Sequence, residues 1–364
     1  MNITIVAGAR PNFMKIAPII EAIKQKKSAG FNINFRLVHT GQHYDKNLSS
    51  TFFEELNIPL PDINLEVKSG TQAEQTAGIM VGFEEELAQN PCDLVLVVGD
   101  VTSTMACTIV AKKAGIDVAH VEAGIRSGDM RMPEEINRIV TDSLTDYFFT
   151  TSTKANENLL NLGIKPEQIF FVGNVMIDTL RKNEHRLKQP EVWQTLNLKP
   201  KNYLVITLHR PSNVDEENQL KSLITQIVTL GKNLPIIFPV HPRTKKLLEG
   251  LNLNFKNLHY TNPLGYLEFN YLVKYALGVL TDSGGITEET TVMNVPCITL
   301  RENTERPETC EIGTNILVGS DSKKIEEAFK NLLANHWKAG KIPELWDGQT
   351  ATRIIDHLTE IYKL

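Results

Sequence analysis

The 364-residue sequence contains few cysteines and none of the common metal or cofactor motifs. Its four cysteines are scattered and include no CxxC pair, so neither a zinc site nor a disulfide framework is expected. His39 and His43 do not have the spacing of a metal site, and no HExxH motif occurs. The GxGxxG fingerprint of nicotinamide and flavin enzymes is also missing. We therefore expect no metal and no cofactor.

Long hydrophobic runs and a surplus of basic residues are absent as well. No apolar stretch approaches the roughly 18 residues that a membrane span needs. The first residues, MNITIVAGAR, show no basic leader and no small-residue cleavage site, so we expect a cytoplasmic protein that does not enter a membrane. The formal net charge of -5 disfavours a nucleic-acid partner, because binding a phosphate backbone needs a surplus of Lys and Arg.

Short β-rich runs alternate with segments of helical period along the whole chain. This alternation predicts an α/β fold with two Rossmann-like, doubly wound domains that face one another across a cleft. We expect an N-terminal domain over 1–174, onto which a helix near 350–364 packs back, and a C-terminal domain over 175–349. The expected strands are ITIVA, FRLVHT, DLVLVVG, VAHVE and YFFTT in the first half, and YLVITLH, PIIFPVH, NLHYT, LGVLTD and PCITL in the second.

The run LTDSGGITEE in the second half predicts a diphosphate site. Ser283, Gly284 and Gly285 follow an apolar strand and open a helix, so backbone amides can close on an anion. Glu289, in that helix, could accept ribose hydroxyls. His209 in LHRPSN ends another strand and is a candidate for phosphate contact or proton transfer, and His241 in PVHP is similarly placed. A helix start whose acids complement the helix dipole explains the same letters.

Acidic residues follow the expected strands of the first half. Asp100 and Glu122 come at strand ends, and Glu134 or Glu135 comes at a helix start after Pro133. Acids that converge on one sheet edge favour proton transfer, because removing and returning a proton needs groups with separated pKa values. Arg138, four residues after Glu134, is a candidate partner for it, and an isolated acid here could equally be a cap or an ion pair. Arg10, in the turn GARPNFMK, is a candidate anion contact.

Ten segments in the same order resemble the non-hydrolysing UDP-N-acetylglucosamine 2-epimerases over about residues 3 to 320. The resemblance implies the two-domain glycosyltransferase B fold, a homodimer, and a role in making polysaccharide precursors for the capsule or cell envelope. The segments are GARPNFMK, HTGQHYD, VVGDVTSTMA, AHVEAGIRSGD, PEEINR, GNVMIDT, LHRPSN, VHPR, LTDSGGITEE and RENTERPE.

By the same resemblance, the substrate is a UDP-sugar and the chain is an isomerase. Loss of UDP from UDP-N-acetylglucosamine would give 2-acetamidoglucal, and re-addition with protonation of carbon 2 from the opposite face would give the manno epimer. The resemblance implies acid and base roles for Asp100, Glu122 and Glu134, with His209 able to act on the phosphate. The implied UDP-sugar contacts are Arg10, Lys15, Arg138, His209, Ser283, Gly284, Gly285, Glu289 and Arg306.

Two segments depart from the family pattern. Tyr44, Asp45 and Lys46 follow Gln42 and His43 where many members carry a QHxxxxxQ-like allosteric segment, which argues against allosteric activation. LHRPSN replaces GHRRE, so a 2,3-diacetamido sugar or its uronic acid is a second candidate substrate. A hydrolysing epimerase, a glycosyltransferase of the same fold and a nucleotide-sugar sensor also stay open as functions. Which acid removes the proton at carbon 2 is open as well.

Overall fold

The computed structural model describes residues 1–41, 55–68, 70–214, 216–240, 248, 250 and 255–364. The chain forms two compact units, Met1–Lys182 with Glu344–Leu364, and Asn183–Pro343. The expected boundary after Asn174 lies before helix α7 (Val175–Asn183), most of which belongs to the first unit. Its contacts explain this, because the Asp178 carboxylate accepts hydrogen bonds from the amides of Thr350 and Ala351, which also lie in that unit.

The first unit contains a parallel sheet of seven strands in the order β3-β2-β1-β4-β5-β6-β7. The order reverses direction between β1 and β4, which is where open α/β sheets bind ligands beyond their carboxyl ends. The strands are β1 (Asn2–Ala7), β2 (Asn34–His39), β3 (Ile63–Asn64), β4 (Leu94–Val98), β5 (Asp117–Val121), β6 (Tyr147–Thr150) and β7 (Ile169–Phe171).

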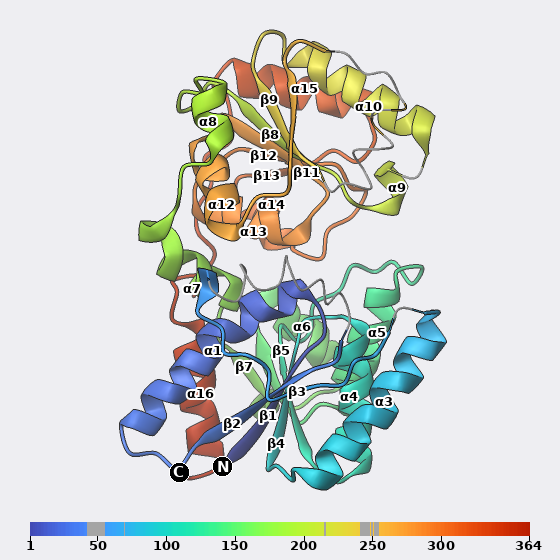
Figure 1. Cartoon of the computed structure of the whole chain (residues 1–364), viewed down its shortest axis with the longest axis vertical. Coiled ribbons are helices and arrows are strands. Elements are labelled where there is room, and N and C mark those ends of the chain that lie inside the picture. The colour runs from blue at the N-terminus through green and yellow to red at the C-terminus, as the bar shows by residue number, and fades with distance from the viewer. Residues whose placement is uncertain (42–54, 69, 215, 241–247, 249, 251–254) are drawn as a thin grey trace. The chain divides into compact units, whose positions relative to one another are not determined.

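Helices cover both faces of this sheet (Figure 1). Helix α1 carries Ile16, Ile19, Ile20 and Ile23 at helical spacing, and all four are buried on one face, beside α16. Helices α3 and α4 bury their apolar sides on the other face. The helices of this unit are α1 (Arg10–Ser28), α3 (Gln72–Gln89), α4 (Thr102–Lys113), α5 (Pro133–Leu144), α6 (Thr153–Asn161), α7 and α16 (Thr350–Ile361), with a 3-10 turn at Pro166–Gln168.

The second unit contains a parallel sheet of six strands in the order β10-β9-β8-β11-β12-β13. Its direction reverses between β8 and β11, so the carboxyl ends of these two strands form the corresponding ligand-binding position. The strands are β8 (Leu204–Thr207), β9 (Ile236–Pro239), β10 (Leu258–Thr261), β11 (Gly278–Thr281), β12 (Cys297–Thr299) and β13 (Asn315–Leu317).

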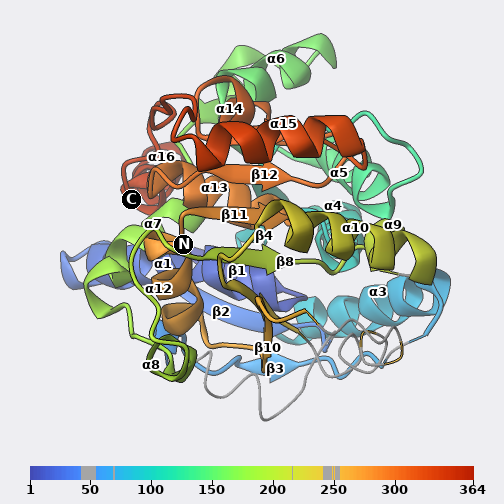
Figure 2. The same cartoon turned by 90° about the horizontal axis from the view of Figure 1, so that it is seen from above.

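Two separate apolar clusters lie on the faces of the second sheet. Helices α10 and α15 pack on one face, which is turned toward the viewer in Figure 2. Helices α8 and α12 pack on the other around Tyr203, Val205 and Val279. The helices are α8 (Glu191–Thr195), α9 (Pro211–Val214), α10 (Glu217–Leu230), α12 (Tyr266–Tyr275), α13 (Gly284–Val292), α14 (Pro307–Glu311) and α15 (Ser322–Leu333), with a 3-10 turn at Glu184–Arg186.

The α/β prediction with two doubly wound domains is confirmed, and all ten expected strands are present. Strands β3, β7 and β13 are additional, and each has two or three residues, which is too short for a periodic signal. In the described part of the chain, no helix is long and apolar enough to cross a membrane.

Candidate active site

The turn after β1 is held close to the end of β4. The amides of Gly8 and Ala9 donate to the Asn12 side chain, which in turn donates to the Val98 carbonyl at 3.0 Å. A Cβ atom on Gly8 would lie 1.9 Å from Ser103 Oγ, so only glycine allows this approach. Helix α1 therefore starts beside the β4 end, while the side chain of its first residue, Arg10, lies outside the described set.

Lys15 and Glu122 form a partly buried ion pair at this edge of the sheet. Lys15 Nζ lies 2.7 Å from Glu122 Oε2, and the Glu122 side chain is 2% exposed. Glu122 also has a φ of 71°, a left-handed conformation that is unusual for glutamate and recurs at functional sites. A Cβ on Gly99 would lie 3.0 Å from Lys15 Nζ, so the pair lies directly beside the strand end that precedes Asp100.

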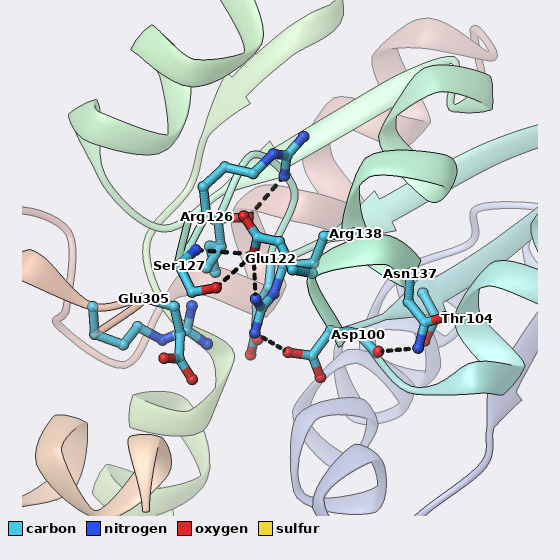
Figure 3. A network of polar contacts seen from close by, with 12 residues as sticks. Asp100, Thr104, Glu122, Arg126, Ser127, Asn137, Arg138 and Glu305 are labelled. Atoms are coloured by element: carbon cyan, nitrogen blue, oxygen red, sulfur yellow. Dashed lines mark hydrogen bonds and ion pairs between the residues drawn. The ribbon is translucent and has the colours of Figure 1, made fainter. Parts of the chain in front are cut away.

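Arg138 joins two acids from different loops. Its guanidinium donates to Asp100 and, at 2.7 Å, to Glu135, and only 3% of the side chain is exposed. Asn137 Nδ2 donates to the Asp100 backbone carbonyl at 2.9 Å. Figure 3 shows Arg138 and Asp100 pointing toward one another, with Asn137 reaching the backbone of Asp100. Helix α5 therefore fixes both the carboxylate and the backbone of Asp100.

The two neighbouring glutamates of α5 have different environments. Glu135 is buried and accepts hydrogen bonds from the amides of Ser127 and Gly128 at 2.9 and 3.0 Å. Burial raises the pKa of Glu135, but these amides and Arg138 outweigh it, so the pKa is lowered. Glu134 is half-buried and has no hydrogen bond or ion pair within the described residues. The expected pairing of Glu134 with Arg138 is therefore wrong, because loop amides draw Glu135 inward instead.

A fully buried histidine supports the loops that carry these acids. His120 lies with Nδ1 2.7 Å from Asp142 and Nε2 2.8 Å from the Gly99 carbonyl. Asp142 also accepts from the Gly124 amide at 3.1 Å and pairs with Arg126 at 2.7 Å. Burial raises the pKa of Asp142, but the charges of His120 and Arg126 outweigh it, so the pKa is lowered. The network thus ties the ends of β4 and β5 to α5.

In the second unit, His209 follows β8 and pairs with a buried carboxylate. His209 Nδ1 lies 2.6 Å from Asp282 Oδ1, with 61% of the histidine side chain exposed and none of Asp282. The β8–β11 register aligns Thr207 with Thr281, so the loops after these strands start level with one another. The exposed imidazole therefore lies at the carboxyl edge of the sheet, where a ligand is expected.

The SGG segment begins helix α13 as expected. Ser283 is the residue before the helix, and its amide donates to Thr281 Oγ1, which leaves the glycine amides of the first turn at this edge. Glu289 lies further along the helix, where it accepts from Tyr266 Oη at 2.9 Å. Burial raises the pKa of Glu289 to about 7, against the lowering effect of Tyr266 and Asn270.

Arg306 lies buried and pairs with Glu288 of α13. Burial raises the pKa of the neighbouring Glu308 to about 7, although the charge of Arg306 lowers it. Among the described residues, no group of three or more His, Cys, Asp or Glu could hold a metal ion. Of the residues named in the sequence analysis, His241 and the segment with Gln42, His43, Tyr44, Asp45 and Lys46 lie outside the described residues, as does the Arg10 side chain.

Two doubly wound units, each with polar residues where the strand order of its sheet reverses, are typical of the glycosyltransferase B class of α/β proteins. A lipopolysaccharide outer core galactosyltransferase shares this architecture at 13% identity and a TM-score of 0.57, a likeness of fold alone. The family model for UDP-N-acetylglucosamine 2-epimerase matches residues 24–359. The chain belongs to the UDP-N-acetylglucosamine 2-epimerase family of isomerases.

Relatives match along the whole chain. A UDP-N-acetylglucosamine 2-epimerase of Methanocaldococcus jannaschii is 43% identical, covering 99% of each chain. The crystal structure of the epimerase from that organism with UDP-GlcNAc and UDP has a TM-score of 0.87 at 42% identity, covering 99% of this chain and 100% of the other. A UDP-2,3-diacetamido-2,3-dideoxy-D-glucuronate 2-epimerase of Pseudomonas aeruginosa is 36% identical, covering 99% of this chain and 100% of its own.

The sequence patterns did not identify His120, Asp142 or Asp282, nor the inward position of Glu135. Asp282 stands directly after a buried strand, which is the same signal that identified Asp100. His120 and Asp142 lie 22 positions apart and have no local signal for their pairing.

Proposed function

We propose that this chain interconverts UDP-N-acetylglucosamine and UDP-N-acetylmannosamine. The observation that carries the proposal is the group of acids at the β4 and β5 ends that pair with basic side chains. Arg138 pairs with Asp100, and Lys15 pairs with Glu122. A sensor or a simple sugar-binding site needs hydroxyl contacts but not so many ionisable groups at one sheet edge. The full-length similarity to epimerases supports the same conclusion.

The reaction begins with departure of UDP from the anomeric carbon, because the hydrogen at carbon 2 is not acidic enough for a side-chain base alone. Elimination gives 2-acetamidoglucal and UDP, and re-addition with protonation from the opposite face gives the manno epimer. Asp100, Glu122 and Glu134 are the proposed acids and bases, with their individual order left open. Since the Glu134 carboxylate has no partner within the described residues, it has the freedom that a proton-transfer group needs.

The groups of the second unit are proposed to hold UDP. His209, Arg306 and the amides of Ser283, Gly284 and Gly285 would stabilise the leaving diphosphate, an electrostatic effect typically worth about 3 kcal/mol per donor. Arg10 is the anion contact proposed for the first unit. Glu289 is buried between α13 and α12 and would accept ribose hydroxyls. Lys15 and Arg138 would contact the sugar or hold its acids in place.

A modified sugar is the second candidate substrate. The 36% identity to a UDP-2,3-diacetamido-2,3-dideoxy-D-glucuronate 2-epimerase and the LHRPSN segment favour it. The same elimination chemistry applies, because only substituents at carbons 3 and 5 differ.

Incubation with UDP-N-acetylglucosamine in deuterated water tests the function directly. Proton NMR should show a UDP-linked manno product that carries deuterium at carbon 2, with no added metal or nicotinamide. Free N-acetylmannosamine with UDP would show a hydrolysing enzyme instead. If no product and no exchange appear with this substrate, the 2,3-diacetamido uronate is tested next, and failure of both would overturn the epimerase proposal.

We also propose that the chain forms a homodimer through α3, α4 and α5. These three helices enclose a largely apolar groove of about 520 Å³, whose lining includes Met80, Met105 and Ile136. Ile136 is 45% exposed, and large apolar side chains gathered around an open groove are typical of an interaction surface. The cytoplasmic location and the supply of polysaccharide precursors stay predictions.

Light scattering of Ile136→Lys tests this interface. The variant should have the mass of a monomer, because a charge in the groove would have to be buried without a partner. Leu162→Lys is the matched control, since Leu162 is 56% exposed after α6, away from the groove, and this variant should keep the mass of a dimer. A dimeric Ile136→Lys variant would place the interface elsewhere.

A further inference from the structure

Asp282 is a fully buried carboxylate at the end of β11, surrounded by donors from the loop that follows β8. The amides of His209 and Arg210 each donate to Asp282 Oδ2 at 3.0 Å, and Asn213 Nδ2 donates to the same oxygen at 3.0 Å. His209 Nδ1 lies 2.6 Å from the other oxygen, Oδ1. A single carboxylate therefore fixes both the backbone conformation of this loop and the orientation of the His209 ring.

The ionisation of Asp282 decides which nitrogen of His209 carries hydrogen. Burial raises the pKa of Asp282, but the hydrogen bonds and charge of His209, with Asn213 and the Arg210 amide, outweigh it and lower the pKa. An ionised carboxylate only accepts hydrogen bonds, so Nδ1 must be the donor. Nε2 is then the ring nitrogen available to a ligand, on a side chain that is 61% exposed.

We propose that Asp282 is a positioning residue that fixes the ring orientation and tautomer of His209, so that Nε2 faces the diphosphate of the substrate and can donate a hydrogen bond to it when the ring is protonated. This inference rests on the proposed function of His209. A protonated ring donates from Nε2 to the leaving diphosphate, and the Asp282 carboxylate at Nδ1 balances the positive charge of the ring. A purely structural role would instead make Asp282 an anchor for the loop through the two amides and Asn213, with no effect on the ring.

The tautomer can be measured directly in the wild-type protein. In protein labelled with 15N-histidine, the signals of His209 are identified by their loss in His209→Gln. Above the pH at which the ring loses its charge, hydrogen should reside on Nδ1, and Asp282→Asn should move it to Nε2 or leave a mixture. Hydrogen on Nε2 in the neutral ring of the wild-type protein would overturn the proposal.

Activity gives a second, independent readout. Asp282→Asn should lower kcat by about 10²- to 10⁴-fold, as loss of an orienting aspartate does in other Asp–His pairs, and should change the pH profile of kcat. Added to His209→Gln, it should cost less than about threefold more, because residues that act as one unit are not additive. Equal losses in both backgrounds would show that Asp282 does not act through His209.

Asn213→Ala is the matched control. It removes one donor to Asp282 and to the Leu300 carbonyl and leaves the ring contact in place, so Tm should fall while kcat and its pH profile stay within about threefold of the wild type. A profile that shifts as much in Asn213→Ala as in Asp282→Asn would reduce Asp282 to a loop anchor. Wild-type protein without deuterium exchange would instead refute the proposed function and leave the tautomer result standing.

Discussion

At the scale of single residues, adjacent glutamates of α5 are separated by what their carboxylates contact. The Glu135 carboxylate accepts hydrogen bonds from two loop amides and from Arg138, so its negative charge is compensated within the protein. Glu134, one position earlier, has no such partners in the described part of the chain. A carboxylate held by loop amides and one without such partners therefore stand side by side in the first turn of this helix.

Glutamine substitutions at these two positions should affect different properties, the exchange rate at Glu134 and the stability at Glu135. Glu134→Gln should lower the rate of deuterium incorporation by about 10²-fold or more and change Tm little, because a proposed proton-transfer group is lost without a buried contact. Glu135→Gln should lower the free energy of unfolding by about 1 to 3 kcal/mol, because it weakens charge-assisted hydrogen bonds. Exchange kinetics and thermal unfolding check the pair, and full exchange activity in Glu134→Gln would remove it from the mechanism.

At the scale of elements, the last helix belongs to the first unit although the whole second unit, Asn183–Pro343, precedes it in the chain. Helix α16 packs beside α1 with Ile354, Ile355 and Leu358 buried. Asp178 of α7 accepts the amides of Thr350 and Ala351 at the start of α16, at 3.1 and 2.7 Å. The first amides of a helix have no acceptor within it, so Asp178 supplies their cap from a distant segment.

Asp178→Ala should therefore weaken the attachment of α16. Burial raises the pKa of Asp178 to about 6, above its usual value of 3.8, so its contribution to stability is complete below about pH 4 and falls as the pH rises through 6. We expect Asp178→Ala to lower the free energy of unfolding by about 1 to 3 kcal/mol at pH 5, since two hydrogen bonds to the first amides of α16 disappear, and by less at pH 8, where the buried carboxylate is charged. Urea denaturation measures the loss, and hydrogen exchange of the α16 amides locates it.

Asp347→Ala is the control for this prediction. It removes an exposed ion pair with Arg353 and the hydrogen bond from the Gln349 amide, and should cost about 1 kcal/mol or less. Equal losses in the two variants would contradict the capping role of Asp178.

At the scale of the whole molecule, buried carboxyls in the second unit couple stability to pH. Burial raises the pKa of both Glu289 and Glu308 to about 7, above the usual value near 4.5. A carboxyl with a raised pKa binds its proton more tightly in the folded state than in the unfolded state. Its contribution to stability is therefore complete below about pH 4.5 and is lost as the pH rises toward 7.

The ligand-free protein should accordingly lose a stabilising contribution between about pH 5 and pH 8, and Glu289→Gln isolates one part of it. Glutamine resembles the neutral acid, so the variant should gain stability relative to the wild type as the pH rises, reaching roughly 1 to 3 kcal/mol. Urea unfolding at several pH values measures the difference. A stability difference that does not change with pH would contradict a raised pKa for Glu289.

Local sequence patterns were enough to predict the fold class and the place of most candidate groups. Alternating periods predicted ten strands, and residues at the end of a parallel strand must lie at its carboxyl edge, which placed Asp100, Glu122 and His209 correctly along the sheet. These conclusions depend on the spacing of apolar and polar residues, which can be read from one segment of the chain without knowledge of the others.

The pairing of these groups, by contrast, depends on how distant segments pack. Arg138 contacts Asp100 from 38 positions away, His209 and Asp282 lie 73 positions apart, and Asp178 reaches Thr350 across 172 positions. Neither segment of such a pair identifies the other, because the contact exists only when the strands take their order in the sheet. The chemistry of a residue type is thus encoded locally, while its partner, burial and protonation follow from the tertiary structure.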